Sequence, residues 1–560
     1  MDVSVDPVRA LVERARDLPR PPAPPLPAFF KRIPPAAKQP TPAAPTEDVA
    51  LHVQAGLEPY GAPLDRKRAA HLLRRTGFGA SPAQIQALTG LTAAEAAGRI
   101  LDEALDREGV PFPEPPAWVD EPIPDLGGPQ EIIDAFIESN IVWLDELTNG
   151  WMTLFRTVGF RERMVLVWHN HFVTQVDDYF LATHAYRYLA MLREHALGDF
   201  KAFVRAVGTD LSMLAYLNGD DNRVGAPNEN YARELLELFT MGPRDRDGND
   251  NYTQDDIVEI ARALTGWIVD YIDNVPVFLN NLHDRGEKTI FGRTGNFGYD
   301  DVVDILFEER AEQVAYFACA KLYKAFVHAV PDPDLVQQMA GVMLASDFAI
   351  EPVMRALLGS AHFFDEEVIG AQLSSPLDML IGMYGNVDLV PDAERVTLLR
   401  LFAGFIEQQV LNPPNVAGWP GYRAWLNTTS LPIRWLMTDF LLFGDNGQQP
   451  LDILAMAAQL PEASDPLVAF TLPVALAEHF MNVPVDRLDI GSVTEAFSGD
   501  LVNNPIPQEV LDGPAYRQDL AKIFLAGVPW YEWNLEEDLA PWTILFFIRF
   551  LSQFPEFHLT

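Results

Sequence analysis

The sequence has a single cysteine, Cys319, among its 560 residues. An internal disulfide is therefore impossible, and folding does not depend on an oxidising compartment. Cys319 lies in the apolar segment Ala315–Leu322, whose pattern is that of a helix. We expect a small buried hydrophobic side chain at this position and not a nucleophile.

Long hydrophobic runs are also missing. The longest ones, Pro466–Ala477 and Thr543–Leu551, are interrupted by Pro473 and Arg549, whereas a membrane-spanning helix needs about 20 apolar residues. The first residues of the chain lack the basic start and the apolar stretch of a secretory signal. The sequence therefore predicts no membrane insertion and favours a cytoplasmic location.

Positive charge is scarce. The chain has 41 Lys and Arg residues, of which 8 are Lys, against 79 Asp and Glu residues, so its formal net charge is −38. Such a surface repels phosphate backbones and anionic lipids, and we expect no nucleic acid partner. The hydrophobic fraction of 48% is ample for a large buried core.

Residues 1–65 are expected to form a Pro-rich tail or linker, since 12 of the first 50 residues are proline. Proline fixes φ and removes a hydrogen-bond donor, which favours extended chain. Helical periodicity begins at Arg66, and no low-complexity linker divides residues 130–560. The sequence predicts one helical core over residues 66–560, with 66–270 and 299–560 as candidate subdomains.

The fold is predicted to be all-α, with many helices around a large single core. Ser81 with Gln84, and Thr92 with Glu95, form predicted capping boxes, in which each side chain bonds the backbone N–H of the other residue. Apolar residues recur at helical spacing over most of the chain. The main expected helices span residues 129–158, 159–176, 183–197, 228–241, 253–268, 309–327, 334–345, 374–386, 396–408, 430–443, 464–482 and 535–551.

Several short motifs of mixed polar and aromatic residues follow one another along the chain. They are His71–Gly79, Trp168–Phe172, Asn228–Phe239, Tyr252-Thr253, Ala261–Trp267, His283-Asp284, Pro413–Pro420 and Pro555–Phe557. In this order they resemble the mainly bacterial family known as domain of unknown function 1800, over roughly residues 66–560. The resemblance implies a helical fold and carries over no catalytic residue. Family members often look exported and are often encoded beside a second secreted protein, which implies a protein partner encoded nearby.

One segment is compatible with a calcium loop of the EF-hand kind, which places oxygen ligands at positions 1, 3, 5, 7, 9 and 12. Two departures weaken the match: Asp250 stands where glycine eases the turn, and the last position is Asp instead of the usual Glu. The alternative is a plain turn followed by a helix start. The candidate ligands are Asp245, Asp247, Asn249, Asn251, Thr253 and Asp256.

A polar face is predicted on the helix that follows Asn228. Arg233 and Glu234 lie beside an apolar stripe, and Glu234 is a candidate ligand or general base, with Arg233 holding an anion. The alternative, which we favour, is an ion-pair network in which Arg233 contacts Glu229 or Glu237.

Histidines supply the remaining candidates. In a helix, His169 and His171 lie about 200° apart and cannot share one ion, so a core histidine bonded to a carbonyl or carboxylate is the favoured interpretation. His283 precedes Asp284, which could orient it as a general base. Equally, His283–Gly286 could form the turn of the one expected β-hairpin, which pairs 276–280 with 288–291.

Two functions from different classes follow. The favoured one is a binding or assembly module that acts with a partner protein and needs an exposed apolar patch. The alternative is a metal-dependent enzyme, a hydrolase or an oxidoreductase, with a polar centre between helices. That centre requires its side chains to converge in a pocket, and its candidate catalytic residues are His169, His171, Arg233, Glu234 and His283.

Overall fold

The computed structural model describes residues 11, 14, 50–125, 127–444, 450–488 and 506–560. Helices dominate the first half of this part of the chain. They are α2 (Arg66–Thr76), α3 (Pro82–Leu88), α4 (Ala93–Leu105), η2 (Ala117–Asp120), α5 (Gln130–Thr157), α6 (Phe160–His169), α7 (Val176–Tyr179), α8 (Ala182–His195), α9 (Phe200–Val207), α10 (Leu211–Tyr216), η3 (Gly219–Asp221), α11 (Asn230–Glu234), the π-helix η4 (Leu235–Thr240) and α12 (Gln254–Ala263).

The second half is helical as well, so the all-α prediction is confirmed. Its helices are α13 (Tyr299–Glu309), α14 (Ala311–Phe326), α15 (Pro333–Ala345), α16 (Ile350–Leu358), α17 (Pro376–Asn386), α18 (Ala393–Phe405), η5 (Tyr422–Trp425), α19 (Ser430–Phe443), α20 (Ile453–Ala457), η6 (Pro461–Ser464), α21 (Val468–Phe480), η7 (Val485–Arg487), α23 (Gln508–Leu511), α24 (Ala515–Leu525), α25 (Ala540–Leu551) and η10 (Pro555–His558).

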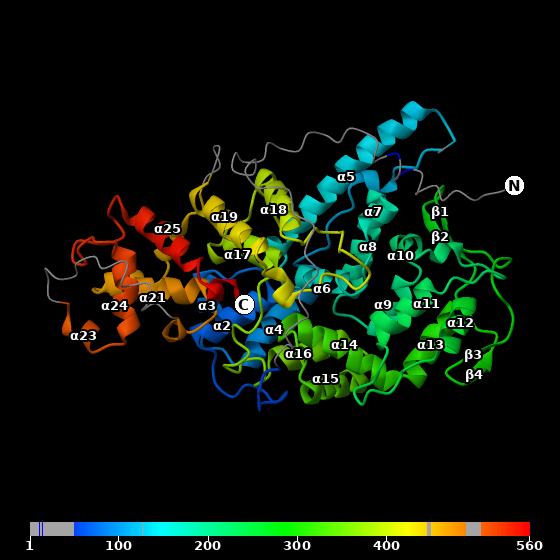
Figure 1. Cartoon of the computed structure of the whole chain (residues 1–560), viewed down its shortest axis with the longest axis horizontal. Helices are drawn as coiled ribbons and strands as arrows, with labels where there is room; N and C mark the ends of the chain where they lie inside the picture. Colours follow the sequence, from blue (N-terminus) through cyan, green and yellow to red (C-terminus); the bar gives the residue numbers. More distant parts are fainter. Residues whose placement is uncertain (1–10, 12–13, 15–49, 126, 445–449, 489–505) are drawn as a thin grey trace.

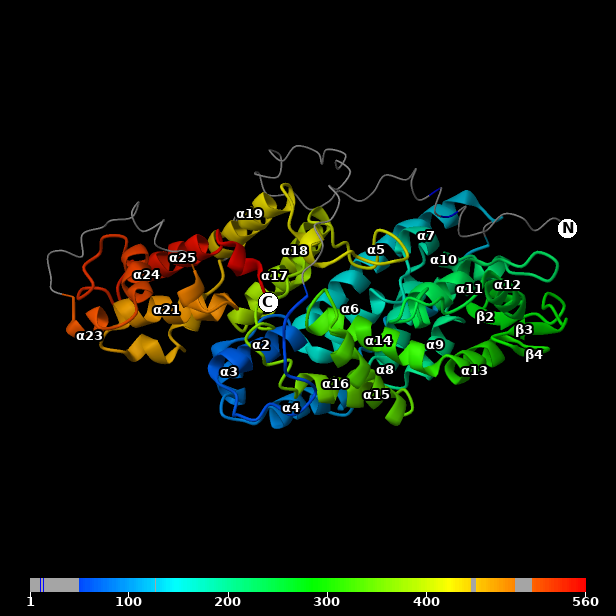
Figure 2. The same cartoon turned by 60° about the horizontal axis from the view of Figure 1, so that its bottom comes forward.

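The helices are arranged along one long axis (Figure 1). Helices α21, α23, α24 and α25 lie at one end, and α11, α12 and α13 lie at the other, beside the hairpins. The last residues of the chain return to the middle, next to α2 and α17, in both views (Figure 2). The last residues of the chain therefore lie beside α2, the first helix of the core in sequence, at the centre of the molecule.

Both predicted capping boxes are present. The Gln84 backbone N–H donates to Ser81 Oγ over 3.3 Å, and Gln84 Oε1 accepts from the Ser81 N–H over 3.1 Å. Thr92 and Glu95 make the same exchange. These contacts satisfy backbone donors that have no partner inside the helix, which is why α3 and α4 start where the sequence places them.

The strands form two hairpins instead of the one expected. Strand β1 (Trp267–Asp270) pairs with β2 (Val275–Phe278), and β3 (Lys288–Ile290) pairs with β4 (Arg293–Gly295), both antiparallel. The expected pairing of 276–280 with 288–291 is therefore wrong. In β3–β4 the turn residues Phe291 and Gly292 both have positive φ, at 49° and 82°, as a tight primed turn needs. Each strand thus pairs across a short local turn, which costs less chain entropy than a longer loop.

One hydrophobic cluster runs from Leu64 to Phe557, and it includes the fully buried Cys319. The described part of the expected tail contacts this core: the Tyr60 N–H donates to the Gly359 carbonyl over 3.0 Å, and Arg14 pairs with Asp134 on α5. The rest of the tail prediction lies outside the described residues. Among the helices that the structure describes, none combines the length and the apolar character that crossing a bilayer demands.

Candidate functional site

The two histidines of the Trp168–Phe172 motif are buried and contact different elements. His169 is the last residue of α6, and its Nδ1 lies 3.2 Å from the hydroxyl of Tyr188 on α8. His171 follows the end of that helix, and its Nε2 lies 2.9 Å from the carbonyl oxygen of Phe239. Since a carbonyl only accepts, His171 Nε2 carries the proton. Both rings are core histidines with separate partners. His171 bonds a carbonyl, as the favoured interpretation expects, whereas the partner of His169 is a tyrosine hydroxyl and not a carbonyl or carboxylate.

Burial also sets the charge of these rings. Desolvation lowers the pKa of His169 to about 3, and desolvation together with the nearby charge of Lys321 lowers the pKa of His171 to about 3. Both rings are neutral near pH 7, and a neutral ring nitrogen is the form that binds a metal. Within the described residues, however, no group of three or more His, Cys, Asp or Glu side chains is placed to hold one.

Three of the sequence motifs meet at the end of α6. His171 bonds the carbonyl of Phe239 in the π-helix η4, and Asn170 Oδ1 accepts from the N–H of Trp419 over 2.7 Å. The rings of His169 and Trp419 lie 5.5 Å apart. The motif residues are thus used to join the loop 411–421 and η4 to α6.

Arg233 and Glu234 lie on a half-exposed face of α11. Arg233 Nη2 donates to Glu229 Oε2 over 2.9 Å and to Gln254 Oε1 over 3.3 Å, so the predicted contact with Glu229 is present. Partial burial, followed by the neighbouring charge of Glu237, raises the pKa of Glu234. The charge of Arg233 is therefore already shared with a carboxylate of its own helix turn.

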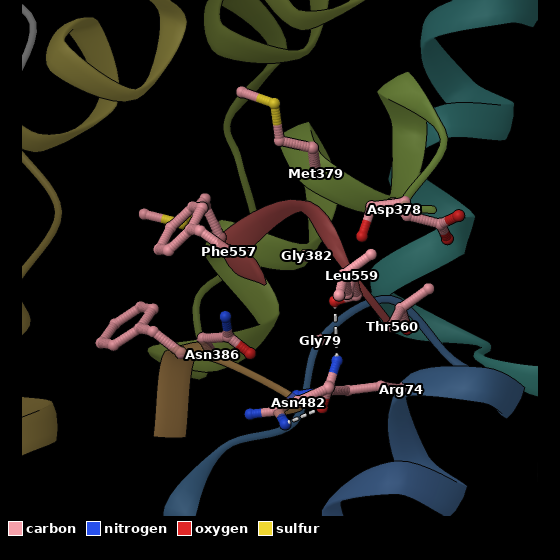
Figure 3. Close-up of a pocket in the computed structure, with 13 residues that line it drawn as sticks. Arg74, Gly79, Asp378, Met379, Gly382, Asn386, Asn482, Phe557, Leu559 and Thr560 are labelled. Atoms are coloured by element: carbon pink, nitrogen blue, oxygen red, sulfur yellow. Dashed lines mark hydrogen bonds between the residues drawn. The ribbon is translucent and has the colours of Figure 1, made fainter. Parts of the chain in front are cut away.

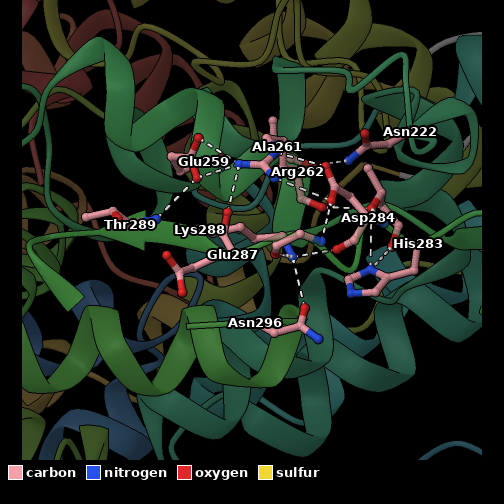
Figure 4. A network of polar contacts seen from close by, with 12 residues as sticks. Asn222, Glu259, Ala261, Arg262, His283, Asp284, Glu287, Lys288, Thr289 and Asn296 are labelled. Carbon is pink, nitrogen blue, oxygen red and sulfur yellow. Dashed lines mark hydrogen bonds and ion pairs between the residues drawn. The ribbon is translucent and has the colours of Figure 1, made fainter. Parts of the chain in front are cut away.

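His283 and Asp284 belong to a polar network that ties strand β3 and the segment before it to α12 (Figure 4). His283 Nδ1 bonds the Thr265 carbonyl oxygen over 2.8 Å. Asp284 Oδ2 accepts from Arg262 Nε over 2.8 Å, and this contact lowers the pKa of Asp284. Lys288 Nζ donates to the Asp284 carbonyl oxygen over 2.5 Å. Asp284 therefore pairs with Arg262 and does not orient His283.

The candidate calcium loop connects η4 to α12. Asp245 Oδ1 accepts from the backbone N–H groups of Asp247 and Asn249, each over 2.9 Å. The carbonyl oxygen of Asn251 accepts from Arg310 Nε over 3.0 Å. Both carboxylate oxygens of Asp256 accept protein hydrogen bonds, one from the Phe291 N–H and the other in the capping box with Thr253. These oxygens are already used by a turn and a helix cap, which is the alternative interpretation.

Within the described residues, no hydrogen bond or ion pair joins any two of the five candidate catalytic residues. A different set of side chains lines a cavity of about 50 Å³ where α2, α17 and the last residues of the chain meet (Figure 3). Arg74 and Asp378 line this cavity, and our sequence reasoning missed both. The available signal is that Arg74 and Arg75 lie three and four residues after His71, on one helix face where apolar residues are expected.

The surface of α25 carries large exposed apolar side chains. Leu539, Trp542 and Phe546 keep 61%, 54% and 57% of their accessible surface. Their spacing of three and four residues places them on one face of the helix. The Trp542 and Phe546 rings lie 6.3 Å apart, and Phe443 of α19 lies 5.4 Å from Phe546. We call Leu539, Trp542 and Phe546 the α25 stripe.

The family model of the protein of unknown function DUF1800 matches residues 71–523. The chain therefore belongs to that family, as the order of its motifs indicates. No curated protein and no solved structure matches the chain. The function of that family is unknown, so membership in it assigns no activity to the chain.

Proposed function

We propose that this protein is a binding module that acts with a partner protein, and that the α25 stripe is its docking surface. The observation that carries the proposal is the exposure of Leu539, Trp542 and Phe546 on one helix face. Single exposed apolar residues are common on protein surfaces, whereas a contiguous exposed patch of large apolar side chains indicates an interaction surface. Aromatic anchors of this kind supply most of the energy in protein interfaces.

Charge favours a basic partner over a second copy of the chain. Glu532, Glu536, Glu537 and Asp538 are exposed just before α25, and every chain carries a net charge of −38. Two identical stripes would bring these carboxylates together, which raises the cost of self-association. A partner helix with one apolar face and one basic face complements both features. A partner encoded beside the gene, which the family resemblance implies, would present such a helix.

The test uses three synthetic helical peptides of roughly 18 residues. The first has Leu on one face and Lys on the other, the second replaces Leu by Ser, and the third replaces Lys by Glu. Binding to the full chain is measured by fluorescence anisotropy of labelled peptide at fixed ionic strength. We expect the Leu/Lys peptide to bind at least about tenfold more tightly than the other two.

Matched variants separate the stripe from general attraction to an acidic protein. Trp542→Gln with Phe546→Gln should weaken the Leu/Lys peptide by about tenfold or more, since each truncated anchor costs more than about 1 kcal/mol. Ile132→Gln with Val142→Gln, at two equally exposed apolar positions on α5, should leave that affinity unchanged. Equal binding by the stripe variant and the unaltered chain refutes the proposal. Concentration-dependent dimerisation that the stripe variant abolishes also refutes it, because the occupant is then a second copy.

A further inference from the structure

The cavity beside the chain's last residues is lined by both polar and apolar groups. It lies between the end of α2, the length of α17, the segment after α21 and η10 (Figure 3). Its volume is about 50 Å³, enough for a few non-hydrogen atoms. The polar side chains on its wall belong to Arg74, Ser374, Asp378, Asn386, Asn482 and Thr560.

Arg74 brings a positive charge to this wall without a carboxylate to balance it. The residue is 9% exposed, and its two terminal nitrogens donate to Asn482 Oδ1 and to the His479 carbonyl oxygen. Both acceptors are neutral. Among the residues that the structure describes, no Asp or Glu pairs with Arg74. A buried charge without a counter-charge is costly, so the site favours an anion.

Asp378 does not supply that counter-charge, because other groups already use it. Arg163 Nη2 lies 2.5 Å from Asp378 Oδ1, and the Ser375 N–H donates to Asp378 Oδ2 over 3.1 Å. The charge of Arg163 balances that of Asp378. Asp378 is therefore no strong barrier to an anion.

Two further guanidinium groups lie within electrostatic range of Asp378. Arg75 donates to the Ala325 and Phe326 carbonyl oxygens at the end of α14. Arg434, which is fully buried, donates to the Ser374 carbonyl oxygen over 2.9 Å. The Nε atoms of Arg163 and Arg434 are buried without a hydrogen-bond partner. We call Arg74, Arg75, Arg163 and Arg434 the arginine cluster.

The charge count of this region is positive. Arg75, Arg163 and Arg434 interact electrostatically with the Asp378 carboxylate, and Arg74 lines the same cavity as Asp378, so four guanidinium groups share one side-chain carboxylate. The rest of the molecule is strongly acidic, with a net charge of −38. A buried cationic region in such a chain needs a reason, and an anionic ligand provides one.

We propose that the cavity beside Arg74 binds a small oxyanion, either an inorganic one or a short carboxylate. Arg74 makes the charged contact with its spare N–H groups, because a guanidinium has five and matches planar or tetrahedral oxyanions well. Asn482 and Asn386 supply neutral polar contacts on either side. The small volume suits a ligand of a few non-hydrogen atoms.

Isothermal titration calorimetry on the full chain tests the site, with sodium sulfate, phosphate, acetate and chloride as separate probes. The protein is first dialysed into a buffer of a bulky zwitterion. Ionic strength is held constant, because screening alone changes the stability of an acidic protein. We expect saturable one-site binding of at least one oxyanion and weaker binding of chloride.

Two variants and one control make the result decisive. Arg74→Gln removes the charge and should weaken binding by about tenfold or more. Asn386→Asp keeps the acceptor for the Ala80 N–H and places a carboxylate in the cavity, so it should abolish binding of an anion. This variant tests the site independently if Arg74→Gln does not fold. Arg355→Gln, at a half-exposed arginine paired with Asp102 and Glu351, should bind as the unaltered chain does. If no oxyanion saturates, or if Asn386→Asp binds normally, the cavity holds only water and the proposal is wrong.

Discussion

At the scale of single residues, the contact between Gly418 and Asn170 shows how distant motifs are joined. Gly418 has φ = +87°, and a Cβ added there would lie 2.4 Å from Asn170 Oδ1 and 2.6 Å from the Asn170 carbonyl oxygen. Only glycine provides both the left-handed backbone and the space. The glycine of the Pro413–Pro420 motif is therefore explained by packing against α6 without any role in chemistry.

A matched pair of substitutions tests this explanation. Gly421, in the same loop, has φ = +69°, but its added Cβ would meet nothing closer than 4.0 Å. We expect Gly421→Ala to cost about 1 kcal/mol of unfolding free energy from backbone strain alone. Gly418→Ala should cost roughly 2–4 kcal/mol, because overpacking adds to the strain. Urea denaturation measures the unfolding free energy of both variants. Equal decreases would show that the close approach of Gly418 to Asn170 does not affect stability.

At the scale of elements, the sequence predicted the helix starts and helix positions, because capping residues and apolar spacing determine them locally. The helix starts at Ser81 and Thr92 follow from capping residues, and most of the long amphipathic segments became helices close to their expected bounds. Two expected helices were too long: 159–176 ends at His169, and 253–268 ends at Ala263. The pairing of the strands was predicted wrongly because strand propensity identifies which residues form strands but not which strands pair. Both observed hairpins close through short turns, whereas the expected one needed a longer loop. The expected helix 228–241 changes to π-helical hydrogen bonding at Leu235. No local sequence pattern predicted this change.

The site depended on tertiary contacts and was correspondingly harder to predict. The burial of His169 and His171 and the contact of Arg233 with Glu229 were foreseen, since residue type and helical spacing carry that information. The cavity beside Arg74 was not. Its wall combines residues from α2, α17 and η10, and no spacing within one segment relates them.

The calcium prediction belongs to the loop between η4 and α12, and a thermal measurement decides it. Because the oxygens of Asp245, Asn251 and Asp256 already accept protein hydrogen bonds, we expect the same melting temperature in millimolar calcium and in a chelator. A rise with calcium at constant ionic strength would instead establish a bound ion. Asp245→Asn, which keeps one acceptor oxygen, should then remove the rise.

At the scale of the whole molecule, buried histidines make stability depend on pH. Burial lowers the pKa to about 3 for His169, His171, His479 and His558, and to about 4 for His184. Unfolding returns each ring to a pKa near 6.5, so the unfolded chain binds more protons below that pH. Stability is therefore complete above pH 6.5 and falls as the pH drops toward 4. Asp210, whose pKa burial raises to about 7, acts in the opposite direction, as do Glu234 and Glu478, whose pKa values burial also raises. These three carboxyl groups are fewer than the histidines whose pKa burial lowers, which also include His71, His195 and His362.

We expect the unfolding free energy from urea denaturation to fall between pH 6.5 and pH 5. Each histidine contributes up to about 1.4 kcal/mol per pH unit once the pH is well below 6.5. The variant His184→Gln should show a shallower slope, because one of the titrating rings is gone. A flat profile over this range would mean that these rings are hydrated in the folded protein.

The meeting of α2 with the last residues of the chain also has a consequence for biosynthesis. Arg74 leaves the ribosome long before Phe557 and Leu559, which close the cavity around it. The acceptors of its guanidinium group, His479 and Asn482, also arrive late, so the group stays hydrated until then. Helices far from this point can pack while translation continues, but the cavity at the centre of the molecule is completed only after Leu559 has emerged.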